Sequence, residues 1–121
     1  MTVQQIDRSG WTVFFEAFTR TLVGQRAEIE VVSLDFGDQI EAGWAPLIGI
    51  TYDHKDDLLQ VAVEGIDHLI KAPKEVYVDY DVGGVIAVEI VGSDGTRQIV
   101  KLKDPLGLPA PIELPAAEPT A

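Results

Sequence analysis

The sequence has no cysteine among its 121 residues. This absence excludes disulfide bonds, zinc–thiolate sites and thiol nucleophiles, and it fits the reducing cytoplasm, where we expect the protein to act. No apolar run approaches the roughly 20 residues that a membrane-spanning helix needs. Residues 1–7 lack the basic and apolar regions of a secretory signal. We therefore expect a soluble protein.

Basic residues are scarce. Nine Lys and Arg stand against 20 Asp and Glu, so the formal net charge is −11. A phosphate backbone or an anionic membrane surface repels such a chain. Arg97, Lys101 and Lys103 form one short basic stripe on the last predicted strand, which is too small to favour nucleic acid. We expect neither nucleic acid nor membrane as a partner.

The short motifs of nucleophilic and phosphate-binding sites are also missing. No G-x-S-x-G elbow surrounds any of the three serines. No G-x-x-x-x-G-K or G-x-G-x-x-G loop is present to hold phosphate. The sequence therefore predicts no bound cofactor.

Aromatic residues are concentrated near the N-terminus, at the spacing of a helix. Ser9 is a candidate N-cap for a helix that begins at Gly10, and Gly24 is a candidate stop. Five apolar residues fall at i, i+3, i+4, i+7 and i+11. They are Trp11, Phe14, Phe15, Phe18 and Leu22. This face predicts an amphipathic helix whose aromatic side is core rather than a ligand platform.

After Gly24 the apolar period changes to two, which predicts strands. Gly43–Pro46 is expected to be a loop, and Gly83-Gly84 a hairpin turn. The predicted strands cover residues 27–34, 39–42, 47–52, 58–63, 67–70, 76–80, 85–91 and 96–103. Short connections favour antiparallel neighbours. We therefore predict an α+β fold: an N-terminal helix followed by a strongly bent antiparallel sheet of seven or eight short strands, closing into a small barrel or roll.

The composition changes near residue 104. Residues 104–121 hold five prolines in 18 positions, together with several alanines. Such a segment is typically extended and flexible. The sequence predicts one domain over residues 1–103 and a flexible Pro/Ala-rich tail over residues 104–121.

Several phrases together resemble a known family. They are W-x-x-F-F-x-x-F from Trp11, Pro46-Leu47 before Gly49-Ile50, Y-D-x-K-D-D from Tyr52, D-H-L-I from Asp67 before Pro73, and Glu89-Ile90 before Asp94-Gly95-Thr96. This set is similar to a family of small bacterial proteins catalogued only as a domain of unknown function. The resemblance covers about Ile6 to Leu102 and implies no activity and no catalytic residue.

Both histidines, His54 and His68, lie near acidic residues. Counted from Asp53, a calcium loop would have a cation, Lys55, at its third position and Leu58 where glycine makes the turn, so this site is disfavoured. A transition-metal site needs about three convergent ligands. We prefer a hairpin turn over residues 53–57, with aspartates bonding their own backbone, and a structural His68.

A non-enzymatic binding or assembly module, with a protein partner or with a second copy of itself, is the preferred interpretation. The candidate partner-binding residues are Trp44, Tyr52, His54 and His68. Trp44 leads because tryptophan is enriched at interface hot spots. The alternative is a metal-binding protein or small enzyme that uses His54, His68 and nearby carboxylates.

Overall fold

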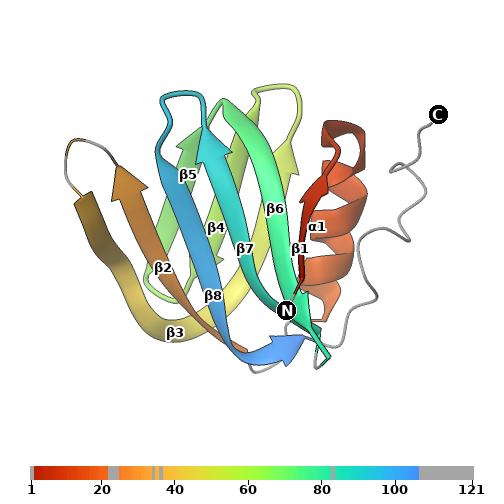
Figure 1. Ribbon diagram of the computed structural model, residues 1–121, viewed down its shortest axis with the longest axis vertical. Helices are drawn as coiled ribbons and strands as arrows, with labels where there is room; N and C mark the ends of the chain where they lie inside the picture. The colour runs from red at the N-terminus through yellow and green to blue at the C-terminus, as the bar shows by residue number, and fades with distance from the viewer. Residues whose placement is uncertain (1, 22–24, 34, 36, 83, 107–121) are drawn as a thin grey trace.

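The computed structural model describes residues 2–21, 25–33, 35, 37–82 and 84–106. These form one α-helix, one short 3₁₀ turn and eight strands (Figure 1). The 3₁₀ turn η1 spans Arg8–Gly10 and the helix α1 spans Trp11–Arg20. The strands are β1 (Thr2–Ile6), β2 (Arg26–Ser33), β3 (Gly37–Asp53), β4 (Leu58–Val63), β5 (Ile66–Lys71), β6 (Pro73–Asp81), β7 (Gly84–Gly92) and β8 (Arg97–Leu106).

All eight strands belong to one sheet with the order β1-β6-β7-β8-β2-β3-β4-β5, and every neighbouring pair is antiparallel. The α+β class and the antiparallel sheet are thus confirmed. The sheet is not closed into a barrel, because β1 and β5 end it without pairing to each other. Among the described residues, no helix is long and apolar enough to cross a membrane.

The 17-residue strand β3 is what bends the sheet. Its residues 37–46 pair with β2, and its residues 47–53 pair with β4, with a register shift between Leu47 and Gly49. This change of partner carries β4 and β5 behind the layer formed by β7, β8 and β2 (Figure 1). The two layers face each other, since Nε2 of His68 on β5 lies 2.5 Å from Oε1 of Gln98 on β8.

The core lies between these layers and is completed by α1. Alternate residues of β4, β6 and β7 are buried, as period-two burial of one strand face requires. The aromatic face of α1 is buried with them, and Phe18 is fully inaccessible. Its buried members are Trp11, Phe14, Phe15 and Phe18, as the helical spacing predicted. Leu22 and Gly24 lie outside the described residues.

Three local predictions were wrong. The segment Thr2–Ile6 was not predicted as a strand, yet it pairs with β6 along its whole length. Gly43–Pro46 is not a loop, because these residues continue β3 through its bend. Ser9 does not cap the helix: the N-cap of α1 is Gly10, which makes no side-chain bond, while Asp7 caps the preceding η1 by accepting from the Ser9 amide at 3.0 Å.

The last strand is longer than predicted. Strand β8 continues to Leu106, three residues past the predicted end of this strand at residue 103. The remaining part of the expected tail, residues 107–121, lies outside the described residues.

Candidate functional site

The guanidinium of Arg8 joins three segments that are distant in sequence. Its Nη1 donates to the Tyr52 hydroxyl at 2.9 Å and to Oδ1 of Asp57 at 3.1 Å. Its Nη2 donates to the carbonyl of Pro73 at 2.8 Å. Tyr52 in turn donates its hydroxyl proton to Asp57 at 2.7 Å. Arg8 thereby ties η1 to the end of β3, to the β3–β4 turn and to the start of β6.

Trp11 forms the buried side of this arrangement. The Arg8 guanidinium carbon lies 4.4 Å from the centroid of the Trp11 ring, a cation–π contact. Tyr52 meets the same ring edge-on, with centroids 5.0 Å apart and an interplanar angle of 84°. The Trp11 indole N–H donates to the carbonyl of Ile6 at 3.0 Å. We call Arg8, Trp11, Tyr52 and Asp57 the Arg8 cluster.

The electrostatics of the cluster follow from these bonds. The Tyr52 hydroxyl, and after it Arg8, holds the pKa of Asp57 below its ordinary value. Burial, reinforced by the Asp57 carboxylate, raises the pKa of Tyr52. The cluster is therefore a stable ion pair with a neutral phenol at neutral pH, a combination suited to holding segments together.

The backbone is left-handed at two positions, one in the cluster and one beside it. Asp57 and Ala72 both have φ of 50°, and the Ala72 amide donates to the Asp57 carbonyl at 2.8 Å. Aspartate tolerates this left-handed region, but alanine rarely adopts it, and Ala72 also precedes a proline. Such strain persists only where surrounding contacts impose it, and it is concentrated at functional sites.

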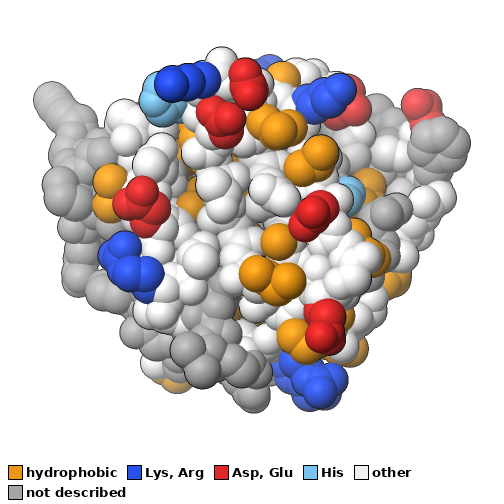
Figure 2. Space-filling model, turned by 180° about the vertical axis from the view of Figure 1, so that it is seen from behind, with side chains coloured by type: hydrophobic (Ala, Val, Ile, Leu, Met, Phe, Trp, Pro, Cys, Tyr) orange, Lys and Arg blue, Asp and Glu red, His pale blue; other side chains and the backbone are white. Residues whose placement is uncertain are grey.

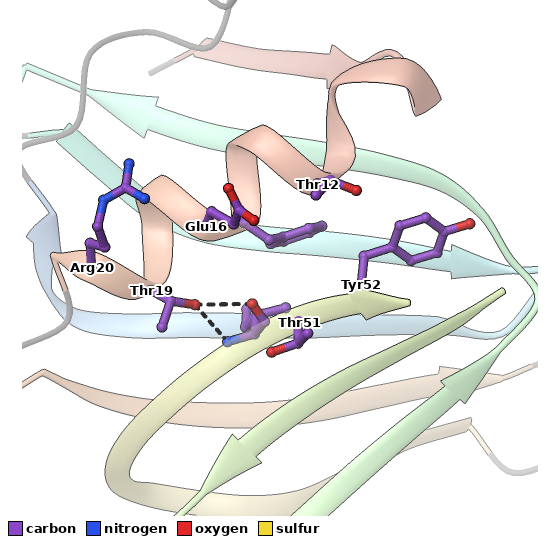
Figure 3. A pocket seen from close by; sticks show the side chains of 8 residues that line it. Thr12, Glu16, Thr19, Arg20, Thr51 and Tyr52 are labelled. Atoms are coloured by element: carbon purple, nitrogen blue, oxygen red, sulfur yellow. Dashed lines mark hydrogen bonds between the residues drawn. The ribbon is translucent and has the colours of Figure 1, made fainter. Parts of the chain in front are cut away.

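Tyr52 also lines a pocket between α1 and β3, which we call the helix–strand pocket (Figure 3). Its cavity has a volume of about 250 Å³. Phe15 and Ile50 contribute apolar lining, whereas the polar lining residues are Thr12, Glu16, Thr19, Arg20, Thr51 and Tyr52. The α1 residues 12, 16 and 20 are spaced by four, so they form one exposed stripe along the helix.

Thr19 closes one end of the pocket by bonding the edge of β3. Its hydroxyl donates to the Ile50 carbonyl at 3.0 Å and accepts from the Ile50 amide at 3.1 Å. This approach requires a glycine next to Ile50, because a Cβ on Gly49 would lie 2.9 Å from the Thr19 methyl carbon. One side chain of α1 thus replaces the backbone partner that a further strand would supply.

The next position on this edge is Tyr52. In an antiparallel pair, successive residues point their backbone groups alternately toward and away from the partner strand. Since the N–H and C=O of Ile50 point away from β4, those of Tyr52 do so as well, toward the side where the pocket lies. Within the described part of the chain, no residue bonds the backbone of Tyr52 on that side. The pocket therefore borders an open segment of strand edge.

The residues proposed from sequence do not form one site. Tyr52 belongs to both the Arg8 cluster and the helix–strand pocket. His54 is exposed in the β3–β4 turn, and His68 points between the layers to Gln98. The register pairs His68 with Val61 and Val61 with Ile50. Ile50 lies three residues, or roughly 10 Å along β3, before Asp53, where the turn that holds His54 begins.

Trp44 lies near the bend of β3, away from the pocket. It is 39% exposed, and the ammonium of Lys103 lies 5.7 Å from its ring centroid.

The expected turn over residues 53–57 is confirmed, because Oδ1 of Asp53 accepts from the amides of Lys55 and Asp56. Within the described ranges, no three His, Asp or Glu side chains gather as a metal site would require.

Sequence reasoning missed Arg8, Thr19 and Gly49. A glycine inside an apolar strand pattern indicates a bulge or a close backbone approach, so Gly49 carried a usable signal. Arg8 and Thr19 carried none, because their partners lie 44 and 31 residues away in sequence.

Comparison with known proteins places the chain in a family. The model for a family of unknown function (DUF5335) matches residues 2–111. A relative described as an uncharacterized protein from Aquifex aeolicus (strain VF5) is 36% identical over 110 residues, covering 90% of this chain and 99% of the relative. No solved structure matches the chain. The resemblance inferred from the sequence phrases is confirmed.

Proposed function

The chain belongs to the family of unknown function DUF5335, and we propose that it is a non-enzymatic binding module whose helix–strand pocket receives an extended peptide segment of a protein partner. The partner adds its backbone to the free edge of β3 at Tyr52. The proposal keeps the cytoplasm as the setting and a protein, rather than nucleic acid or a membrane, as the partner.

The observation that carries the proposal is the interrupted edge of β3. Thr19 satisfies both backbone groups of Ile50, and the equivalent groups of Tyr52 have no such partner in the described chain. Edge N–H and C=O groups pair readily with an added strand, and main-chain bonds of this kind give affinity without demanding one sequence.

The size and lining of the pocket favour a short segment over a small-molecule substrate. Its volume of about 250 Å³ lies below the roughly 300–1,000 Å³ that is usual for pockets enclosing drug-sized ligands. Glu16 and Arg20 supply both signs of charge at the rim. A short peptide segment fits a pocket of this volume, and its backbone both donates and accepts hydrogen bonds, as the exposed groups of Tyr52 require.

The other candidate residues enter the proposal unequally. Tyr52 contributes its backbone to the partner, while the Arg8 cluster fixes its side chain. Trp44 and His54 are exposed and remain proposed secondary contacts for a longer partner. His68 is left out, because its ring is held by Gln98.

Selection from a library of displayed linear peptides tests the proposal. Wild-type protein is the target, and Thr12→Trp, which fills the mouth of the pocket from the exposed side of α1, is the matched counter-target. Selected peptides should bind the wild type, lose binding to Thr12→Trp, and shift the amide resonances of Ile50 and Tyr52.

Backbone recognition has its own control. Methylating the peptide nitrogen that donates to the Tyr52 carbonyl should abolish binding, whereas methylation one residue away should not. Peptides that bind Thr12→Trp as well as the wild type, or a selection that yields no peptide dependent on the pocket, would contradict the proposed function.

A further inference from the structure

Another open strand edge belongs to β5, at one end of the sheet. β5 pairs with β4 on one side only, and no other described element packs along it. Its sequence, IDHLIK, has no proline, and the strand carries no register shift against β4. These are features of an edge that can accept another strand.

The hydrogen-bonding pattern decides which residues of β5 present their backbone at this edge. The Ile50 bonds to Thr19 make Thr51↔Gln60 the pair that exchanges hydrogen bonds between β3 and β4. Gln60 therefore points its backbone toward β3 and away from Leu69, its partner in β5. It follows that Leu69 points its own N–H and C=O outward, as do Asp67 and Lys71 two residues to either side.

The same three residues place their side chains on the outer face. Asp67, Leu69 and Lys71 are exposed, and Leu69 is 51% accessible, while His68 and Ile70 point inward. Figure 2 views the molecule from the side of this layer and shows hydrophobic side chains in small groups between charged ones. β5 thus offers an anion, an apolar side chain and a cation in line with three outward pairs of backbone groups.

This arrangement is self-complementary. In an antiparallel pair of two β5 strands related by a two-fold axis through Leu69, each Leu69 faces its counterpart. Asp67 then faces Lys71 of the second copy on both sides of the axis. Opposite charges in directly opposed positions attract, and like charges there repel. A two-fold axis repeats each favourable contact.

Other registers lack this match. A continuous outer face and outward backbone groups require odd-numbered residues to oppose odd-numbered residues. Shifting the axis to His68 or to Ile70 sets Leu69 against a charge. Shifting it to Asp67 or Lys71 sets like charges against each other. The register centred on Leu69 is the one that pairs both charges.

We propose that two copies of this chain associate through β5, antiparallel and centred on Leu69, so that β3-β4-β5 of each copy forms half of a six-stranded layer. The partner is a second copy because the recognition elements of β5 complement themselves. A six-residue strand buries less surface than stable dimers do, so the dimer is weak and concentration-dependent. The contact is separate from the helix–strand pocket.

Charge-swapped variants test the register. In sedimentation velocity of the full chain, wild type should shift from monomer to dimer as concentration rises. Asp67→Lys or Lys71→Asp alone should raise the dimer dissociation constant about tenfold, because two attractive pairs become repulsive. An equimolar mixture of the two single variants should restore association, since each copy then supplies the charge that the other lacks. Lys55→Asp, in the exposed β3–β4 turn, is the matched control and should dimerise like wild type.

A cross-link gives an independent readout. The chain has no cysteine, so Leu69→Cys introduces a single thiol at the two-fold axis. Opposed residues of a hydrogen-bonded pair lie about 5.5 Å apart at Cα, within the range that a disulfide spans. Leu69→Cys should therefore oxidise to a covalent dimer far faster than Thr51→Cys, an exposed position on β3.

Each failure overturns the proposal. A wild-type chain that stays monomeric up to millimolar concentration rules out the dimer. Single charge variants that associate like wild type place the contact elsewhere. A mixture that fails to associate, or equal cross-linking at Leu69→Cys and Thr51→Cys, rules out the register. Circular dichroism spectra of the variants should match that of the wild type, because all the substituted residues are exposed, and this measurement controls for loss of the fold.

Discussion

The second half of β3 and strand β5 both present an edge to which no described strand pairs, but the two edges are covered differently. At β3, the helix α1 lies along the edge and Thr19 bonds both backbone groups of Ile50. At β5, no described element covers the edge, and charged side chains flank Leu69. Covering an edge with a helix and placing charged side chains along it are both established ways to manage unpaired backbone. The β3 edge is therefore closed at Ile50 and left open at Tyr52, whereas no described element closes any part of the β5 edge.

The largest test of the covered edge is removal of its helix contact. Phe18→Ala should lower the free energy of unfolding by about 3–5 kcal/mol, because Phe18 is fully buried in the core. Urea unfolding measures this loss. Hydrogen exchange at the Ile50 amide should accelerate at the same time, because the helix that supplies Thr19 loosens.

Val13→Ala is the matched control on the same helix, since Val13 is 48% exposed. Its effect on unfolding should stay within about 0.5 kcal/mol. Equal effects of Phe18→Ala and Val13→Ala would mean that α1 does not pack on the sheet as described.

A smaller test acts on the close approach between α1 and β3. Gly49→Ala places a methyl group 2.9 Å from the Thr19 methyl carbon, so the helix must shift and its bonds to Ile50 must lengthen. The expected loss of unfolding free energy is about 1–3 kcal/mol, as for other overpacked sites. Chemical denaturation should show no such loss for Gly43→Ala, because a Cβ at Gly43 meets no atom within 4 Å.

Thr19→Val removes the hydroxyl while keeping the shape of the side chain. The Ile50 amide and carbonyl then lose their partner, which should cost about 1–2 kcal/mol in unfolding free energy. Thr51→Val, exposed on the same strand, controls for the loss of a hydroxyl alone. If both substitutions have the same effect, the two Thr19 bonds do not stabilise the edge.

The sequence predicts the features that depend on residues close together in the chain better than those that depend on distant residues. The aromatic helix face and the turn at Asp53 were predictable because their patterns are local. The continuity of β3 was not, because Gly43–Pro46 has the composition of a loop, and pairing with two different strands holds it extended. Strand β1 was missed because its polar residues form an edge strand whose order comes from β6.

The site was less predictable than the fold. Tyr52 was proposed, but its role arises from Arg8, 44 residues earlier in the chain. The two histidines drew attention because their residue type suits metal binding. The sheet register then separates them. The residue types alone therefore suggested metal binding as an alternative, and the strand pairing was needed to show how far apart the two histidines lie.

The smallest expected effect comes from acid, which acts where the covered edge ends at Tyr52. The pKa of Asp57 is held below its ordinary 3.8 by the Tyr52 hydroxyl and by Arg8. As pH falls through 3.8, the unfolded chain binds the proton first, so the folded state loses relative stability. The contribution of Asp57 is therefore complete above about pH 5 and disappears as pH falls through its folded pKa.

Asp57→Asn keeps a residue that tolerates φ of 50°. In urea unfolding, the stability gap between wild type and Asp57→Asn should be constant from pH 6 to 8 and should narrow toward pH 3. Asp56→Asn removes one negative charge from the same turn and leaves the Arg8 cluster intact, so it controls for the loss of charge alone. A gap for Asp57→Asn that stays constant or widens in acid would show that the Arg8 cluster does not secure this end of β3.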